Sequence, residues 1–136
     1  MLNFMKLITH LLILFITCNS VAQDAVIKTD SVKPPKEYDN IHVKKISSDS
    51  LSSTFIIWIK QKVRLHKHLH HRENVIIQEG SGQFQLKDSI YNVSEGDIIT
   101  IPKNTWHGVT INSKDAMKVI SIQSPKFIGN DRVFKK

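Results

Sequence analysis

From position 41 onward, short apolar runs alternate with clusters of turn residues. The runs are rich in Val, Ile, Phe and Thr, and no stretch keeps the 3.6-residue period of a helix. The predicted strands are Ile41–Ile46, Thr54–Leu65, Asn74–Gln78, Gly82–Leu86, Ile90–Val93, Asp97–Ile101, His107–Ile111 and Met117–Ile122. Short strands at close spacing, with turn signals between them, indicate an all-β sandwich or barrel.

The first 22 residues follow a different pattern. Lys6 precedes an apolar run from Leu7 to Ile16, and Ser20-Val21-Ala22 places small residues ahead of Gln23. This order is typical of a secretory signal peptide, and the run is shorter than the roughly 20 residues that span a bilayer. Residues 1–22 are therefore predicted to be a signal peptide, and the protein is predicted to be periplasmic or secreted.

Two other interpretations of the N-terminus stay open. One is a buried or membrane-anchoring helix, and the other is a lipoprotein signal cut before Cys18, which Phe15-Ile16-Thr17 fits poorly. Residues 23–40 are polar, contain Pro34-Pro35 and predict an extended lead-in. The predicted organisation is thus a signal peptide at 1–22, a lead-in at 23–40 and one β-barrel domain at 41–136.

Composition narrows the class of protein further. A length of 136 residues suits one domain, and the single cysteine excludes a disulfide framework or a metal site built from cysteines. The net charge of +7 allows an anionic small molecule as partner. Nucleic acid is not expected, because basic and aromatic residues are not interleaved. Lys60, Lys62 and Arg64 share strand parity with His66, which predicts either a positive inner rim or a solvated face.

The histidines carry the chemical signal. His66 and His68 are two residues apart, so in a strand both side chains project from the same face and could share one metal ion. Glu73 follows closely enough to add an oxygen ligand. Alone, this pattern is more often a solvated pair than a metal site.

The surrounding residues resemble the cupin family. Its first motif corresponds here to His66-Lys67-His68, four residues, Glu73, six residues and Gly80. Its second motif corresponds to Gly96, five residues, Pro102-Lys103-Asn104, two residues and His107. Both occur in the right order at the right spacing, and the resemblance covers roughly residues 54–123.

Three positions depart from the family pattern. Lys60 and Asn104 stand where the family has glycine, and Ile111 stands where it often has asparagine. Asn tolerates positive φ better than most residues, so the turn at Asn104 can still form. None of the three would supply a metal ligand.

The resemblance implies a double-stranded β-helix, a small jelly-roll-like barrel with one open mouth. The implied ligands of a divalent metal ion are His66, His68, Glu73 and His107, and Glu73 could instead act as a general base. Such a ligand set suits Fe, Mn, Ni, Zn or Cu without choosing among them.

The implied function is a metal-dependent enzyme, of oxygenase, isomerase or lyase type, acting on a small oxygen-rich molecule. The alternative is a non-catalytic periplasmic module that binds a sugar or another small ligand. A homodimer is allowed, and no membrane span is expected in the mature chain. His70 and His71 are interpreted as surface residues of a turn, and the alternative for His70 is a place at the mouth of the pocket or a role as a proton shuttle. Trp106 either walls the pocket or packs elsewhere.

Overall fold

The computed structural model describes residues 26–136, so the predicted signal peptide lies outside the described residues. The first unit of the chain, which ends at Val32, contains a single turn of 3-10 helix, η1 (Thr29–Ser31). No helix within residues 26–136 has the length and apolar character needed to cross a membrane.

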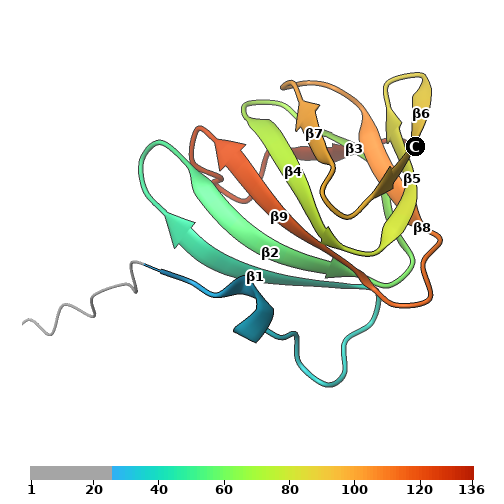
Figure 1. Cartoon of the computed structure of the whole chain (residues 1–136). Helices are drawn as coiled ribbons and strands as arrows, with labels where there is room; N and C mark the ends of the chain where they lie inside the picture. The colour runs from blue at the N-terminus through green and yellow to red at the C-terminus, as the bar shows by residue number, and fades with distance from the viewer. Residues whose placement is uncertain (1–25) are drawn as a thin grey trace, which may run out of the picture. The chain divides into compact units, whose positions relative to one another are not determined.

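The second unit, Lys33–Lys136, is built from two antiparallel five-stranded sheets (Figure 1). One sheet has the order β1-β2-β9-β4-β7 and the other β10-β3-β8-β5-β6. The strands are β1 (Ile41–Ser48), β2 (Ser53–Ile59), β3 (Lys62–His68), β4 (Arg72–Glu79), β5 (Ser81–Leu86), β6 (Ser89–Ser94), β7 (Ile98–Ile101), β8 (His107–Ile111), β9 (Met117–Ser124) and β10 (Arg132–Phe134). The all-β barrel expected from the alternating pattern is therefore confirmed.

One predicted strand is in fact two. The segment 54–65 breaks at Lys60 and Gln61, where the chain turns from β2 into β3. The Asn40 side chain holds this turn, because its Oδ1 accepts hydrogen bonds from the backbone N–H groups of Gln61 (2.8 Å) and Lys62 (3.2 Å). The turn contains neither Gly nor Pro, so the sequence offers no local signal for it. The exposed three-residue β10 was also not predicted.

The second motif turns as expected. Asn104 adopts φ 59°, in the left-handed region where the family has glycine. Asn is one of the few other residues that enter this region readily.

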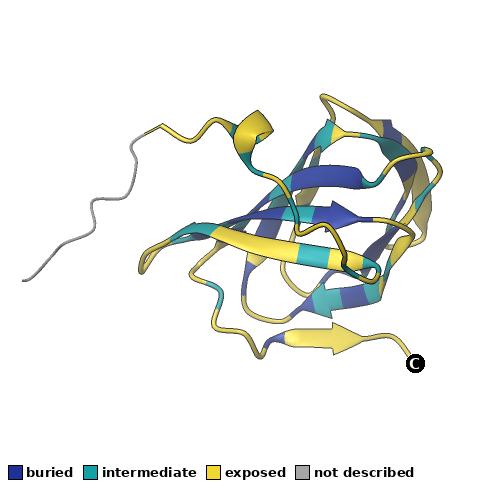
Figure 2. Cartoon of the chain, turned by 90° about the horizontal axis from the view of Figure 1, so that it is seen from below, coloured by how far each residue is buried: buried dark blue, intermediate teal, exposed yellow. Residues whose placement is uncertain are grey.

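The barrel interior changes from apolar to polar along two adjacent strands. On β4, the polar Glu73 precedes the apolar Val75 on the same face, and on β9, which runs antiparallel to it, the apolar Val119 is followed by Ser121 and Gln123. The register places Glu73 opposite Gln123 and Val75 opposite Ser121. All five side chains are buried, and Figure 2 shows the buried stretches on the strands that enclose the interior. A polar site is thus built over an apolar core.

A β-bulge in β3 decides which of its residues face inward. β3 and β8 pair Val63 with Val109 and His66 with His107, so Arg64 and Leu65 together oppose the single residue Gly108. A bulge of this kind shifts the alternation by one position. Gly108 is required here, because a Cβ at that position would lie 2.8 Å from the carbonyl oxygen of Val63.

Of the two interpretations of the cations that precede His66, the structure supports the solvated face and not the positive inner rim. Val63 lines the interior cavity together with His66, whereas Lys62 and Arg64 are exposed and absent from the cavity wall. Lys60 is also exposed, and its ammonium lies 4.0 Å from the centroid of the Tyr38 ring. The prediction that these cations share the face of His66 was wrong, because it assumed a strand without a bulge.

Candidate metal centre

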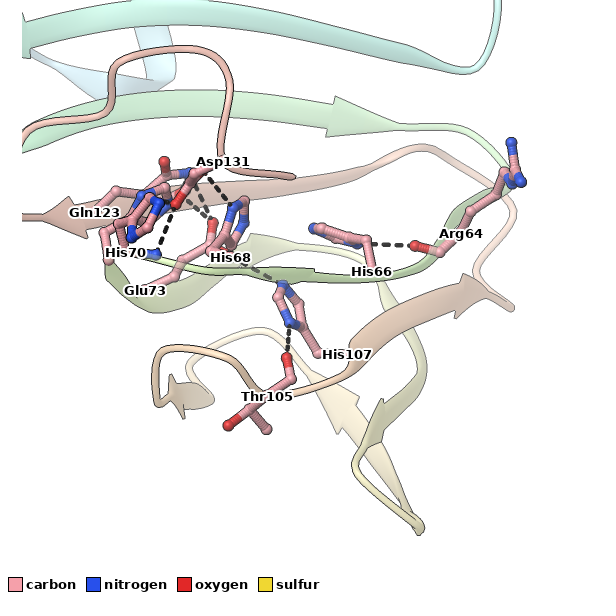
Figure 3. Close-up of polar contacts among 11 residues, drawn as sticks. Arg64, His66, His68, His70, Glu73, Thr105, His107, Gln123 and Asp131 are labelled. Carbon is pink, nitrogen blue, oxygen red and sulfur yellow. Dashed lines mark hydrogen bonds and ion pairs between the residues drawn. The ribbon is translucent and has the colours of Figure 1, made fainter. Parts of the chain in front are cut away.

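The structure brings the four predicted site residues together inside the barrel (Figure 3). His66 and His68 come from β3, Glu73 from β4, and His107 is the first residue of β8. One ring nitrogen from each histidine lies within 4.8 Å of the others. Oε2 of Glu73 lies 3.5 Å from Nε2 of His68 and 3.3 Å from Nε2 of His107.

The Nδ1 atom of each histidine faces an oxygen acceptor. Nδ1 of His66 lies 2.8 Å from the carbonyl oxygen of Arg64, and Nδ1 of His107 lies 2.9 Å from that of Thr105. Nδ1 of His68 lies 3.4 Å from Oδ1 of Asp131. A carbonyl oxygen only accepts, so this arrangement assigns the proton to Nδ1 and leaves a lone pair on Nε2. Metal-binding histidines are held in the same way by outer acceptors.

Glu73 is also held at one oxygen. Its Oε1 accepts hydrogen bonds from the Ser121 hydroxyl and from Nε2 of Gln123, the latter at 3.2 Å. Burial opposes ionisation, but in the metal-free protein hydrogen bonds to the carboxylate outweigh it, from the His107 and His68 rings when their Nε2 atoms carry a proton and from the Ser121 hydroxyl. The pKa of Glu73 therefore lies well below its usual range. The carboxylate therefore presents a charged Oε2 to the histidines.

His66 is neutral across the physiological range. Burial disfavours the imidazolium, the neighbouring His107 adds to the effect, and the pKa of His66 falls from its ordinary 6.5 to about 4. A neutral imidazole is the form that binds a metal ion.

Asp131 joins the site to the C-terminal segment. Its side chain is fully buried, its Oδ2 lies 2.7 Å from Nδ1 of His71, and the backbone N–H of His70 donates to the same oxygen at 3.2 Å. His71 is 2% exposed, so its interpretation as a surface residue was wrong, whereas His70 is exposed as expected. The sequence carries no sign of this contact, because 63 positions separate Asp131 from His68.

Replacing Asp131 with asparagine is expected to weaken metal binding about 10- to 100-fold, the usual cost of losing an outer-shell partner. The amide offers one accepting oxygen, so either His68 or His71 would face an N–H group instead. Competition with a chelator measures the affinity, and Asp97→Asn, which alters an exposed turn carboxylate bonded to the N–H of Ser94, is the control. Equal affinities for the wild type and both variants would contradict a positioning role for Asp131.

A cavity of about 80 Å³ adjoins the four residues. Apart from them and Gly108, its wall is formed by apolar side chains and one arginine: Ile41, Val43, Ile57, Ile59, Val63, Val75, Ile77, Phe84, Ile99, Val109, Met117, Val119 and Arg132. Trp106 is not part of this wall, and the Lys67 ammonium lies 4.9 Å from its ring centroid. Of the two interpretations of Trp106, the structure thus supports packing elsewhere.

A two-sheet antiparallel barrel with histidines and a carboxylate converging inside it defines a class of small β-barrel proteins with a candidate metal site. The chain belongs to the Cupin domain family, whose profile matches residues 54–123.

Individual relatives are distant. The chain is 29% identical over 75 residues to the mannose-1-phosphate guanylyltransferase RfbM of Salmonella typhimurium, covering 55% of this chain but 16% of that protein. It is 26% identical over 101 residues to the acireductone dioxygenase of Rattus norvegicus, covering 68% of this chain and 54% of the dioxygenase. Among solved structures, Streptomyces PAC13 with bound uridine superposes with a TM-score of 0.64 at 16% identity, covering 73% of this chain and 82% of that one. At this identity the structural likeness concerns the fold.

Proposed function

We propose that this cupin binds one divalent transition metal ion through His66, His68, Glu73 and His107, and that it acts as a metal-dependent enzyme on a small molecule. The observation that carries the proposal is the convergence of Nε2 of His68 and His107 with Oε2 of Glu73, at 3.3 and 3.5 Å. Nε2 of His107 is buried without a hydrogen-bond partner among the described residues.

The residues fit a cation on chemical grounds. Lone pairs on imidazole nitrogens and a carboxylate oxygen repel one another at these distances unless a positive charge lies between them. A proton would join two of these atoms, whereas a metal ion can bind all four. Three nitrogen ligands and one oxygen ligand suit Fe(II), Mn(II), Ni(II), Zn(II) or Cu(II).

Such an ion, when bound, supplies Lewis acidity or an activated water or oxygen. The residues of the chain hold the ligand atoms in place through Arg64, Thr105 and Asp131. The low pKa of Glu73 makes its carboxylate a weak base near neutrality, which favours its role as a ligand over that of a general base.

The names of related cupins support an enzymatic role without choosing a reaction. One relative is a dioxygenase, and PAC13 is described as a nucleoside dehydratase. Oxygenase, isomerase and lyase chemistry therefore stay within the proposal. We also propose export, and Gln23 is then the expected first residue of the mature protein.

The test is elemental analysis of the purified chain, followed by substrate screening with and without the metal found. We expect close to one metal ion per chain in the wild type and much less in Glu73→Gln, which keeps the size of the side chain but removes its charge. Metal-dependent turnover supports an enzyme, and saturable binding without turnover would instead support a binding module. A chain that holds no metal would overturn the proposal.

A further inference from the structure

Arg132 is the one cationic side chain in the wall of the cavity beside the candidate metal centre. It is the first residue of β10 and lies opposite His68 in the β3–β10 register. The preceding residue, Asp131, is fixed by His68, His71 and the backbone of His70. Arg132 is therefore carried by a segment anchored to the site itself.

The guanidinium has no carboxylate partner in the described part of the chain. None of the ion pairs found among residues 26–136 involves Arg132. The Arg132 side chain lines the cavity, and the residue is exposed to solvent. Its positive charge is therefore available to an anion that enters the cavity.

The rest of the wall offers almost nothing to a polar ligand. Beyond the four residues of the candidate centre, twelve of its members are aliphatic, aromatic or thioether side chains, and none carries a hydroxyl or amide group. Each sugar hydroxyl buried there without a partner would cost about 1–3 kcal/mol. The wall therefore favours a ligand with an apolar body.

The volume of the cavity limits how large the apolar part of the ligand can be. Its volume of about 80 Å³ lies far below the roughly 300–1,000 Å³ of pockets that take drug-sized ligands. A short branched chain fits this volume better than a large ring system.

We propose that the site takes small organic carboxylates with an apolar body, the carboxylate pairing with Arg132 and the body lying against the apolar wall. A guanidinium recognises a carboxylate through two parallel hydrogen bonds, which adds geometric selection to charge. This inference rests on the proposed function for its placement beside a metal ion, while recognition of the anion depends on Arg132 and the wall.

The test compares three probes by NMR titration of the zinc-loaded and the metal-free protein. 3-Methylbutanoate carries both the charge and the apolar body, 3-methylbutanamide lacks the charge, and acetate lacks most of the body. We expect 3-methylbutanoate to bind at least tenfold more tightly than either of the other two, since a charged hydrogen-bonded pair and three buried carbons each contribute that much or more.

Variants assign the selectivity to Arg132. Arg132→Gln is expected to lower the affinity for 3-methylbutanoate at least tenfold and to leave that for the amide within twofold. Arg132→Lys, which keeps the charge, is expected to bind the acid more tightly than Arg132→Gln. Arg64→Gln is the matched control, because Arg64 is exposed outside the cavity wall and lies 5.1 Å from the Phe134 ring centroid. The same spectra report whether each variant is folded.

The outcomes separate the two proposals. A protein that retains zinc but binds acid and amide equally, or that binds the acid as tightly after Arg132→Gln, overturns this inference alone. A protein that selects the acid through Arg132 but retains no zinc supports the inference and overturns the metal site.

Discussion

Replacing His107 with alanine is expected to lower metal affinity by more than a hundredfold, beyond the 10- to 100-fold that the loss of an outer partner costs. His107 is 3% exposed, and its Nε2 lies 3.3 Å from Oε2 of Glu73, so alanine leaves a gap where water would have to replace a fixed imidazole. The variant also removes a residue of the second cupin motif, which tests whether distant parts of the chain share one ion.

Two measurements check this expectation. Competition with a chelator gives the affinity, and thermal unfolding gives the stabilisation by metal, about 2.7 kcal/mol when free metal exceeds its Kd a hundredfold. The wild type should gain this stability on metal addition, and the His107→Ala variant should gain little at the same concentration.

His70→Ala is the matched control. His70 belongs to the same histidine-rich stretch, but its side chain is exposed and only its backbone N–H contacts Asp131. Metal binding should persist in this variant. Loss of metal in His70→Ala together with retention in His107→Ala would mean that the cluster around His68 and His107 is not the site.

Local pattern was sufficient for most of the fold. Short apolar runs from Asn74 onward predicted strands whose ends agree with the structure within a few residues. The resemblance to the cupin family, rather than local pattern, implied that His66 and His107 belong to one site. The β2–β3 turn escaped prediction because Asn40, about 20 positions upstream, stabilises it. No window of the sequence around Lys60 contains that information.

The residues of the site also fall into two groups, those that the sequence could have predicted and those that depend on distant contacts. Ser121 and Gln123 could have been found, because they are polar residues on the same face of β9 as the apolar Met117 and Val119, and they lie near Glu73. Asp131 could not, since its contact with His71 depends on how the C-terminal segment returns to β3. The bulge at Arg64 could not be predicted either, because it follows from pairing with Gly108.

The metal-free protein is expected to lose up to about 3 kcal/mol of stability between pH 6.5 and pH 4 because of His66. In the unfolded chain this imidazole gains a proton near its ordinary pKa of 6.5, whereas in the folded chain it does so near 4. The unfolded state therefore binds more protons throughout this interval, and stability falls as the pH falls. The size of this loss of stability follows from about 1.36 kcal/mol for each unit between the unfolded and the folded pKa of His66.

Glu73 acts in the same direction at lower pH. The pKa of Glu73 in the folded protein lies well below its ordinary value in the unfolded chain. The stability that Glu73 contributes is therefore fully present above the ordinary pKa and is lost as the pH falls from there toward the folded pKa. Urea unfolding of the chelator-treated protein across the range measures both effects. His66→Asn, which cannot titrate, isolates the first.

Comparing the wild type with the His66→Asn variant shows whether the pH dependence of stability comes from His66. Between pH 6.5 and pH 4 the stability of the His66→Asn variant should depend less steeply on pH than that of the wild type, with the curves separating by up to about 3 kcal/mol. Parallel curves would mean that the folded protein protonates His66 as readily as the unfolded chain does. Because 4% exposure leaves an imidazolium almost no water, that result would require the barrel interior to open in acid rather than to remain closed around a neutral ring.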